Sequence, residues 1–183
     1  MTQKFTILLL HANYNKSIRG KLWFQKILFL ISQNIEELKE DADFEEDLMG
    51  PYSETAAEEF EQLILDRFIH KRFPNDLTSL GKTIARNLEE KISNEEIEII
   101  IDMKKFLNDL TEDELLGFIY FSYSEYTEES IKFHKIKKNR LNIAISLFRK
   151  NKISLGKASL ISGLDQEELI KLLKQKGIKI YVE

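Results

Sequence analysis

Helix-start signals recur through this 183-residue chain and constrain its fold more than any other feature. A Ser or Thr followed three residues later by Glu can form a capping box, in which each side chain bonds the backbone N–H of the other residue. Thr55–Glu58, Ser93–Glu96 and Thr111–Glu114 have this spacing, and each stands before apolar residues at helical intervals. The chain contains only two prolines, which would break helices. The sequence therefore predicts a mostly α-helical protein.

The first 92 residues have the order of elements that a winged helix-turn-helix domain requires. The predicted elements are a helix over 4–11, a helix over 20–32, a polar connection over 34–47, a helix from Ser53 or Thr55, short strands over 68–73 and 77–78, and a helix over 79–92. Pro74, Asn75 and Asp76 separate the two strands and are typical turn residues. We therefore predict a small β wing in an otherwise α-helical first domain.

The rest of the chain divides into a connector and a small C-terminal module. Helices are predicted over 93–110 and from Thr111 to Tyr123, and residues 124–138 are polar. Another amphipathic helix follows around 141–148. The predicted domains are a winged-helix-like domain over 1–92, a helical connector over 93–138 and a helix-turn-helix module over 139–183.

The C-terminal module carries the sharpest local pattern. Ser154 can cap one helix, and Gly163 can end it in a left-handed conformation. Asp165 can cap the next helix, with Glu168 at its third position. Ser159, Leu164, Leu169 and Leu172 supply the small and apolar residues that fix the angle of a helix-turn-helix. An ordinary helical hairpin has the same caps, so both interpretations stay open.

Charge is distributed unevenly along the chain. Residues 1–131 hold 14 Lys and Arg against 27 Asp and Glu, whereas residues 132–183 hold 13 against 4. A basic segment can contact phosphates, although it can also be a solvated helix face. The predicted nucleic-acid contacts are Lys135, Lys137, Lys138, Arg140, Arg149, Lys150, Lys152, Lys157, Gln166, Lys171 and Lys174. Acidic residues at the start of the second C-terminal helix, and Glu54, Glu58, Glu59 and Glu61 in the first domain, oppose DNA contact there.

Several function classes are excluded or disfavoured. The chain has no cysteine, which removes disulfides and Cys-based zinc sites. It has no Gly-rich phosphate loop, no Gly-x-Ser-x-Gly and no His-Glu-x-x-His. No segment approaches the ~20 apolar residues that span a bilayer. We therefore expect a non-enzymatic, cytoplasmic protein without cofactor, metal or membrane partner.

Two parts of the chain resemble known families. Residues 153–181 resemble the core of uncharacterised protein family 0175, whose short prokaryotic members are commonly regarded as antitoxin-like. The matching positions are Ser154, Lys157, Ala158, Gly163, Leu164, Leu172, Leu173, Gly177 and Ile178. Residues 20–90 are more loosely similar to the Panacea, or SocA-like, antitoxin domain, through KILFL at 26–30, GPYS at 50–53 and LTSLG at 77–81. Neither resemblance brings a catalytic residue or a cofactor.

These observations lead to one expected function and one alternative. The first is a DNA-associated transcriptional regulator or antitoxin-like protein of a prokaryotic toxin–antitoxin system, which binds double-stranded DNA as a homodimer in the manner of most helix-turn-helix proteins. The alternative is a protein–protein interaction module that binds a toxin, or another copy of itself, without touching DNA.

Overall fold

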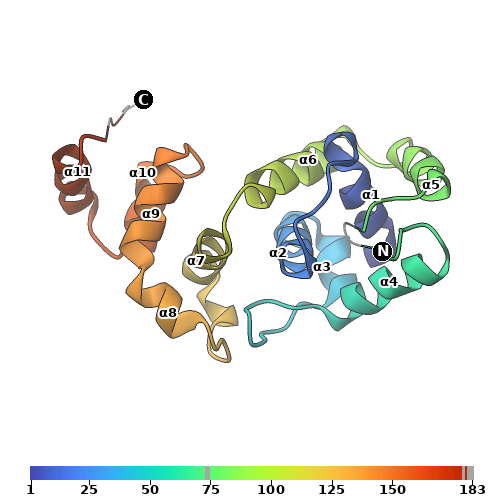
Figure 1. Cartoon of the computed structure of the whole chain (residues 1–183), viewed down its shortest axis with the longest axis horizontal. Coiled ribbons are helices and arrows are strands. Elements are labelled where there is room, and N and C mark those ends of the chain that lie inside the picture. The colour runs from blue at the N-terminus through green and yellow to red at the C-terminus, as the bar shows by residue number, and fades with distance from the viewer. Residues whose placement is uncertain (73–74, 179, 181–183) are drawn as a thin grey trace. The chain divides into compact units, whose positions relative to one another are not determined.

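The computed structural model describes residues 1–72, 75–178 and 180, and in this part of the chain it contains helices and no β-strand (Figure 1). The chain divides into two compact units. Unit 1 comprises Met1–Glu45 and Pro51–Asp109, and unit 2 comprises Glu46–Gly50 and Leu110–Glu183. The division falls inside the segment 93–138 that the sequence analysis treats as a connector.

Unit 1 is built around its first helix. Its described helices are α1 (Thr2–Asn15), α2 (Lys21–Ser32), α3 (Glu36–Ala42), α4 (Glu54–Leu65), α5 (Ser79–Glu89) and α6 (Asn94–Asn108). Apolar residues lie on every side of α1, and Phe5 and Leu9 are fully buried. Because a helix that is hydrophobic all round needs partners on all sides, α1 packs against α3, α4, α5 and α6.

Charged side chains from other helices close both ends of α1. At its start, the Asp41 carboxylate accepts hydrogen bonds from the backbone N–H and the hydroxyl of Thr2, at 2.7 and 2.8 Å. These bonds lower the pKa of Asp41 to about 2. The regular helix of α1 stops where the backbone of Ala12, Asn13 and Tyr14 leaves the helical conformation. At that end, the Lys104 ammonium donates to the carbonyl oxygens of Leu9, Leu10 and Ala12, at 2.8, 3.2 and 2.9 Å. Anion and cation each occupy the end that the helix dipole favours.

A turn after α3 is held by neighbouring residues of α2. The Gln25 side-chain amide donates to the carbonyl of Ser53 and accepts from its N–H, both at 3.0 Å. Lys26, which is 1% exposed, donates to the carbonyl of Pro51 at 2.7 Å. The Ser53 hydroxyl then caps α4 by accepting from the N–H of Ala56. The motifs at 26–30 and 50–53 therefore contact each other inside unit 1.

The prediction of a winged helix-turn-helix with a β wing is wrong, because the described residues contain no strand. Within the described residues the hairpin reduces to a single antiparallel bridge between Ile69 and Leu77, while Phe73 and Pro74 lie outside them. The backbone N–H groups of Phe68 and Ile69 both bond the carbonyl of Leu63. The N–H of Phe68, at the expected start of the first strand, is thus used to end α4. Only two backbone bonds, from His70 N–H to the Asp76 carbonyl and from Thr78 N–H to the Phe68 carbonyl, flank the bridge, so the described residues form no extended strand.

Three local expectations for unit 1 also differ from the structure. The cap of α4 is Ser53, so the predicted Thr55–Glu58 box does not start this helix. The stretch expected as a polar connection contains α3. The apolar stripe that helical spacing predicts for residues 93–110, at Ile99, Met103, Phe106 and Leu110, is fully buried only at Leu110, because the buried face of α6 lies one position on, at Ile100, Lys104 and Leu107. The capping box at Ser93 and Glu96 is confirmed.

Unit 2 collects short helices over a small core. Its described helices are α7 (Glu112–Ser122), η1 (Ser124–Tyr126), α8 (Phe133–Lys138), α9 (Arg140–Arg149), α10 (Leu155–Ser162) and α11 (Gln166–Gln175). Ile145, Ala158, Leu169 and Leu173 form a buried cluster that joins α9, α10 and α11. The capping box at Thr111 and Glu114 is confirmed at the start of α7.

The turn between α10 and α11 matches the sequence pattern. Ser154 caps α10 by accepting from the N–H of Lys157, and Asp165 caps α11 by accepting from the N–H of Glu168. Gly163 has φ +76° and ends α10 in the left-handed region, as predicted. A Cβ there would lie 2.5 Å from the Arg140 guanidinium, so a side chain at this position would displace Arg140 as well as strain the backbone.

Candidate nucleic-acid interface

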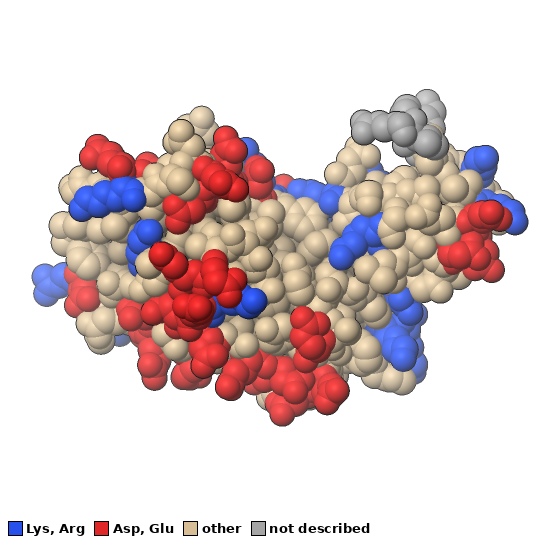
Figure 2. Space-filling model, turned by 180° about the vertical axis from the view of Figure 1, so that it is seen from behind, with Lys and Arg blue, Asp and Glu red and all other residues tan. Residues whose placement is uncertain are grey.

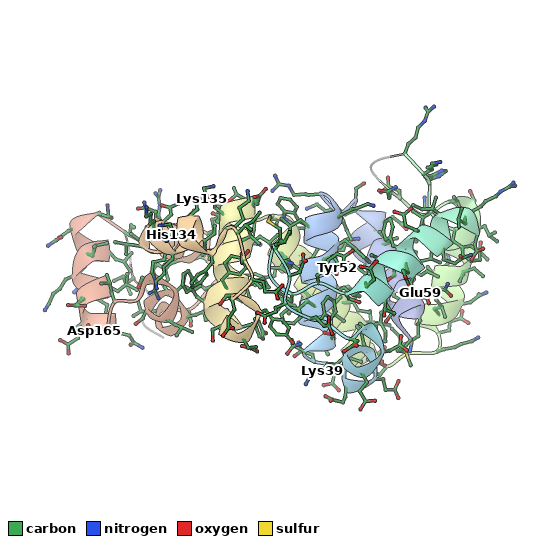
Figure 3. All side chains as sticks on the ribbon, turned by 90° about the horizontal axis from the view of Figure 1, so that it is seen from below. Lys39, Tyr52, Glu59, His134, Lys135 and Asp165 are labelled. Carbon is green, nitrogen blue, oxygen red and sulfur yellow. The ribbon has the colours of Figure 1, made fainter. Side chains whose placement is uncertain are left out.

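The eleven predicted nucleic-acid contacts all lie in unit 2. They occupy α8 (Lys135, Lys137, Lys138), α9 and the turn after it (Arg140, Arg149, Lys150, Lys152), α10 (Lys157) and α11 (Gln166, Lys171, Lys174). Figure 3 shows Lys135 on one side of unit 2 and Asp165, at the start of α11, on the opposite side. The candidates are therefore spread over four helices of unit 2, and Lys135 and the start of α11 face different sides of the unit.

The acidic first turn of α7 forms ion pairs with three lysines of this basic segment. Lys132 pairs with Glu112 at 3.2 Å, Lys135 with Asp113 at 2.8 Å, and Lys150 with Glu114 at 2.6 Å, as three consecutive carboxylates each receive one lysine. The hydrogen bond to Asp113 raises the pKa of Lys135. Two of the eleven candidates, Lys135 and Lys150, thus already have an anionic partner inside the molecule.

Glu114 is the most enclosed of these carboxylates, with only 4% of its surface exposed. Its two oxygens accept from Lys150 Nζ at 2.6 and 2.7 Å, from Ser146 Oγ at 2.6 Å and from the N–H of Thr111 at 2.8 Å. Burial opposes the charged form of Glu114, but the hydrogen bonds from Lys150, Ser146 and Thr111 outweigh it and lower the pKa. Glu114 therefore ties the start of α7 to the end of α9.

Arg140 has a structural role that the sequence analysis did not assign. Its guanidinium donates to the carbonyls of Ile161 and Leu160, at 2.7 and 2.8 Å, and lies over the ring of Phe121 at 4.5 Å. Those carbonyls belong to the last turn of α10, where a helix has no bonding partners of its own. Arg140 thus caps α10 from α9, and it can reach a phosphate only by leaving this end of the helix.

Two more candidate lysines lie against aromatic rings. Lys157 Nζ is 5.4 Å from the centre of the Phe118 ring, and burial lowers the pKa of this lysine. Lys137 Nζ is 5.7 Å from the centre of the Phe133 ring but stays exposed. The aromatic residues of α7 and α8 therefore serve as packing surfaces for lysine stems, a common arrangement for long basic side chains.

The charge of unit 2 as a folded body is close to balanced. Its residues include 13 Lys and Arg against 12 Asp and Glu, because Glu46, Asp47 and the acids between 112 and 129 belong to the same unit. Figure 2 shows the Lys and Arg side chains as separate groups and not as one continuous patch on the face drawn. The exposed candidates are Lys135, Lys137, Lys138, Arg149, Lys150, Gln166, Lys171 and Lys174.

Sequence reasoning missed the buried polar residues of unit 1. Lys104 and Lys26 are almost completely enclosed, and Gln25 is 4% exposed. A signal for Lys104 was present, since it lies four residues after Ile100 and three before Leu107 in one helical stripe. Its partners could not be inferred, because the carbonyls that it bonds lie more than 90 residues earlier.

By fold and by site, unit 2 is a helical module with a capped helix–turn–helix pair. Residues 119–183, about a third of the chain, match the model of the Uncharacterised protein family (UPF0175), which confirms the resemblance drawn from residues 153–181. Comparisons with curated proteins and with solved structures gave no match. In the part of the chain that the structure describes, no helix is long and apolar enough to cross a bilayer.

Proposed function

We propose that this protein is a non-enzymatic, antitoxin-like binding protein whose unit 2 holds another protein, in preference to DNA. The observation that carries the proposal is the set of ion pairs between α7 and the basic segment. Lys132, Lys135 and Lys150 are each paired with a consecutive carboxylate, and Arg140 caps a helix. The family match supports the antitoxin-like class.

Electrostatics explains why DNA is the weaker partner. Affinity for duplex DNA comes largely from cations that replace counterions along the phosphate backbone. A lysine that already pairs with a carboxylate must break that pair to contribute, so it adds little. With 13 basic against 12 acidic residues, unit 2 also has almost no net charge to steer a polyanion towards it.

One observation still supports association with DNA. Lys137, Lys138, Arg149, Lys171 and Lys174 are exposed, and no carboxylate pairs with them among the ion pairs described. They lie on three helices, and α11 begins with the exposed acids Asp165, Glu167 and Glu168. Acids at that end stabilise the helix but repel phosphates. These residues therefore support weak, sequence-independent contact better than base reading.

A salt titration separates the two functions. Fluorescence anisotropy of a labelled DNA duplex with the full chain should show weak binding that changes little with salt. A protein that makes six or more phosphate contacts loses about 1,000-fold in affinity between ~50 and ~200 mM salt. A loss of that size, abolished by charge reversal of Lys137, Lys138 and Arg149, would contradict the proposal. Asp113→Asn is the matched control, because it frees Lys135 and should strengthen any DNA contact.

The partner is tested by co-expression with the products of adjacent reading frames. A complex of defined mass in light scattering, formed without DNA, is the expected result. The homodimer stays a prediction, and the same measurement on the protein alone tests it against the 21.5 kDa of the monomer. If no neighbouring product binds and DNA does, the regulator function replaces the proposed one.

A further inference from the structure

Unit 2 contains an open cleft of about 1380 Å³ beside the end of α9, the start of α10 and the turn after α11. Its apolar lining comes from Ile145, Phe148, Ile153, Leu155 and Ile178, and its charged lining from Arg149, Lys152 and Lys176. The volume exceeds the ~300–1,000 Å³ of typical small-molecule sites. The size and openness therefore suit a length of polypeptide better than a metabolite.

The charge of the cleft has one sign. Arg149, Lys152 and Lys176 contribute three cations, and the described lining contains no Asp or Glu. The N-terminal turn of α10, at Leu155 and Gly156, adds partial positive charge of the same sign. These positive charges would attract an anionic partner.

Part of the cleft lining is apolar, and part is polar without charge, from Asn142, Ser146, Asn151 and Ser154. Phe148, Ile153, Leu155 and Ile178 are only partly buried, and their inner surfaces pack against the core cluster of unit 2. Such side chains offer hydrophobic area to a ligand while the core holds them in place. A phosphodiester backbone has little apolar surface with which to cover them. The apolar part of the lining therefore favours an amphipathic polypeptide over a nucleic acid, and the polar part can bond its backbone.

We propose that this cleft binds an amphipathic helix of a partner protein, with apolar side chains at every third or fourth position and carboxylates between them. The apolar side chains would cover Phe148 and its neighbours, and the carboxylates would face Arg149 and Lys176. This inference rests on the proposed function, because it places the protein partner at a specific site on unit 2. Helix-in-groove recognition of this kind depends on a few apolar anchors flanked by complementary charges.

Three fluorescein-labelled peptides test the cleft with the full-length protein. The first is a helical peptide with Leu at every third or fourth position and Glu elsewhere. In the second peptide Ser replaces Leu, and in the third Lys replaces Glu. We expect anisotropy to show binding of the first peptide only. Arg149→Glu combined with Lys176→Glu should weaken that binding about tenfold or more, while Lys138→Glu combined with Lys171→Glu, two exposed positions outside the lining, should not.

The outcomes separate the site from the function. Equal binding of the Ser peptide, or equal weakening by both variant pairs, overturns the cleft as the site. If an adjacent gene product binds and the Arg149→Glu, Lys176→Glu protein retains it, the cleft inference fails and the proposed function stands. Displacement of the peptide by duplex DNA, with the same variant sensitivity, overturns both. Self-association lost in the cleft variant assigns the cleft to a second copy and overturns the partner. Circular dichroism checks the fold of each variant, and the peptide series needs no variant.

Discussion

The two units use basic side chains at helix ends in different ways. In unit 1, Lys104 is completely enclosed and bonds three carbonyls at the end of α1. In unit 2, Arg140 closes α10 from a half-exposed position, and the lysines pair with carboxylates at the rim of α7. The first arrangement places a basic group in the interior against carbonyls alone, whereas the second keeps each basic group near water.

The difference follows from where each helix lies. α1 is buried on all sides, so its last carbonyls have no water to bond and must be satisfied from within. α7 begins at the surface of its unit, and its carboxylates can hold solvated lysines at small cost. A count of basic residues is therefore a poor guide to nucleic-acid binding until their positions relative to helix ends are known.

The largest effect should come from removing the interior lysine of unit 1. Lys104→Met keeps much of the side-chain volume but leaves three carbonyls without a donor. We expect a loss of about 3 kcal/mol in the free energy of unfolding, since each buried unsatisfied group costs ~1–3 kcal/mol. Hydrogen exchange should show faster exchange in α1 and α6 than in α7 to α11. Lys91→Met, at an exposed position, is the control and should change neither unit. A stable Lys104→Met protein would show that the apolar replacement compensates.

The same residue should make unit 1 respond to alkaline pH. Burial lowers the pKa of Lys104 from 10.5 to about 7. Between these values the unfolded chain binds a proton that the folded chain lacks, so stability rises with pH, although the neutral Lys104 amine can donate to only two of the three carbonyls. The gain between pH 7 and 9 should be about 2 kcal/mol, at no more than ~1.36 kcal/mol per pH unit. Urea unfolding of the wild type and of Lys104→Met over this range measures it. Parallel pH profiles for the two proteins would contradict the assignment.

Local patterns were predictable and long-range contacts were not. Ser93 with Glu96, Thr111 with Glu114, and Gly163 depend on residues within a few positions, and the structure confirms them. The wing is reduced to one bridge because the carbonyl of Leu63, five residues before Phe68, takes the Phe68 N–H that would extend the pairing. For the candidate interface, the sequence located the basic residues but not their partners. Glu114 lies 36 residues before Lys150, and nothing local connects them.

A glycine pair tests the helix end of unit 2. Gly163 and Gly177 both have positive φ, +76° and +70°, but only Gly163 faces another group, the guanidinium of Arg140. Alanine at either position should cost about 1–2 kcal/mol for the left-handed conformation. Gly163→Ala should cost more than Gly177→Ala, because it also displaces Arg140 from the carbonyls of α10. Thermal unfolding of both variants measures the difference. Equal losses would mean that Arg140 moves aside freely and does not hold α10.

A smaller effect should come from the carboxylate that joins α7 to α9, and the smallest from its neighbour Asp113. Glu114→Gln keeps the shape of the side chain but removes the charge that Lys150 and Ser146 bond. Because Lys150 is partly solvated, we expect a loss of about 1 kcal/mol, within the range for hydrogen bonds to charged groups of mixed exposure. Asp113→Asn, which breaks the more exposed pair with Lys135, should cost less.

Measurements at acidic pH distinguish an electrostatic role of Glu114 from a purely steric one. The pKa of Glu114 is lowered in the folded protein, so its contribution is complete above the ordinary carboxyl pKa and disappears as the pH falls through the lowered value. Wild type and Glu114→Gln should therefore differ in stability near pH 7 and converge at strongly acidic pH, as followed by hydrogen exchange in α7 and α9. This acid-sensitive contact in unit 2 is the counterpart of the alkaline response of Lys104 in unit 1. A difference between the two proteins that persists unchanged in acid would mean that the Glu114→Gln substitution disturbs packing, and that the lysine-to-carboxylate contact does not hold the basic segment in place.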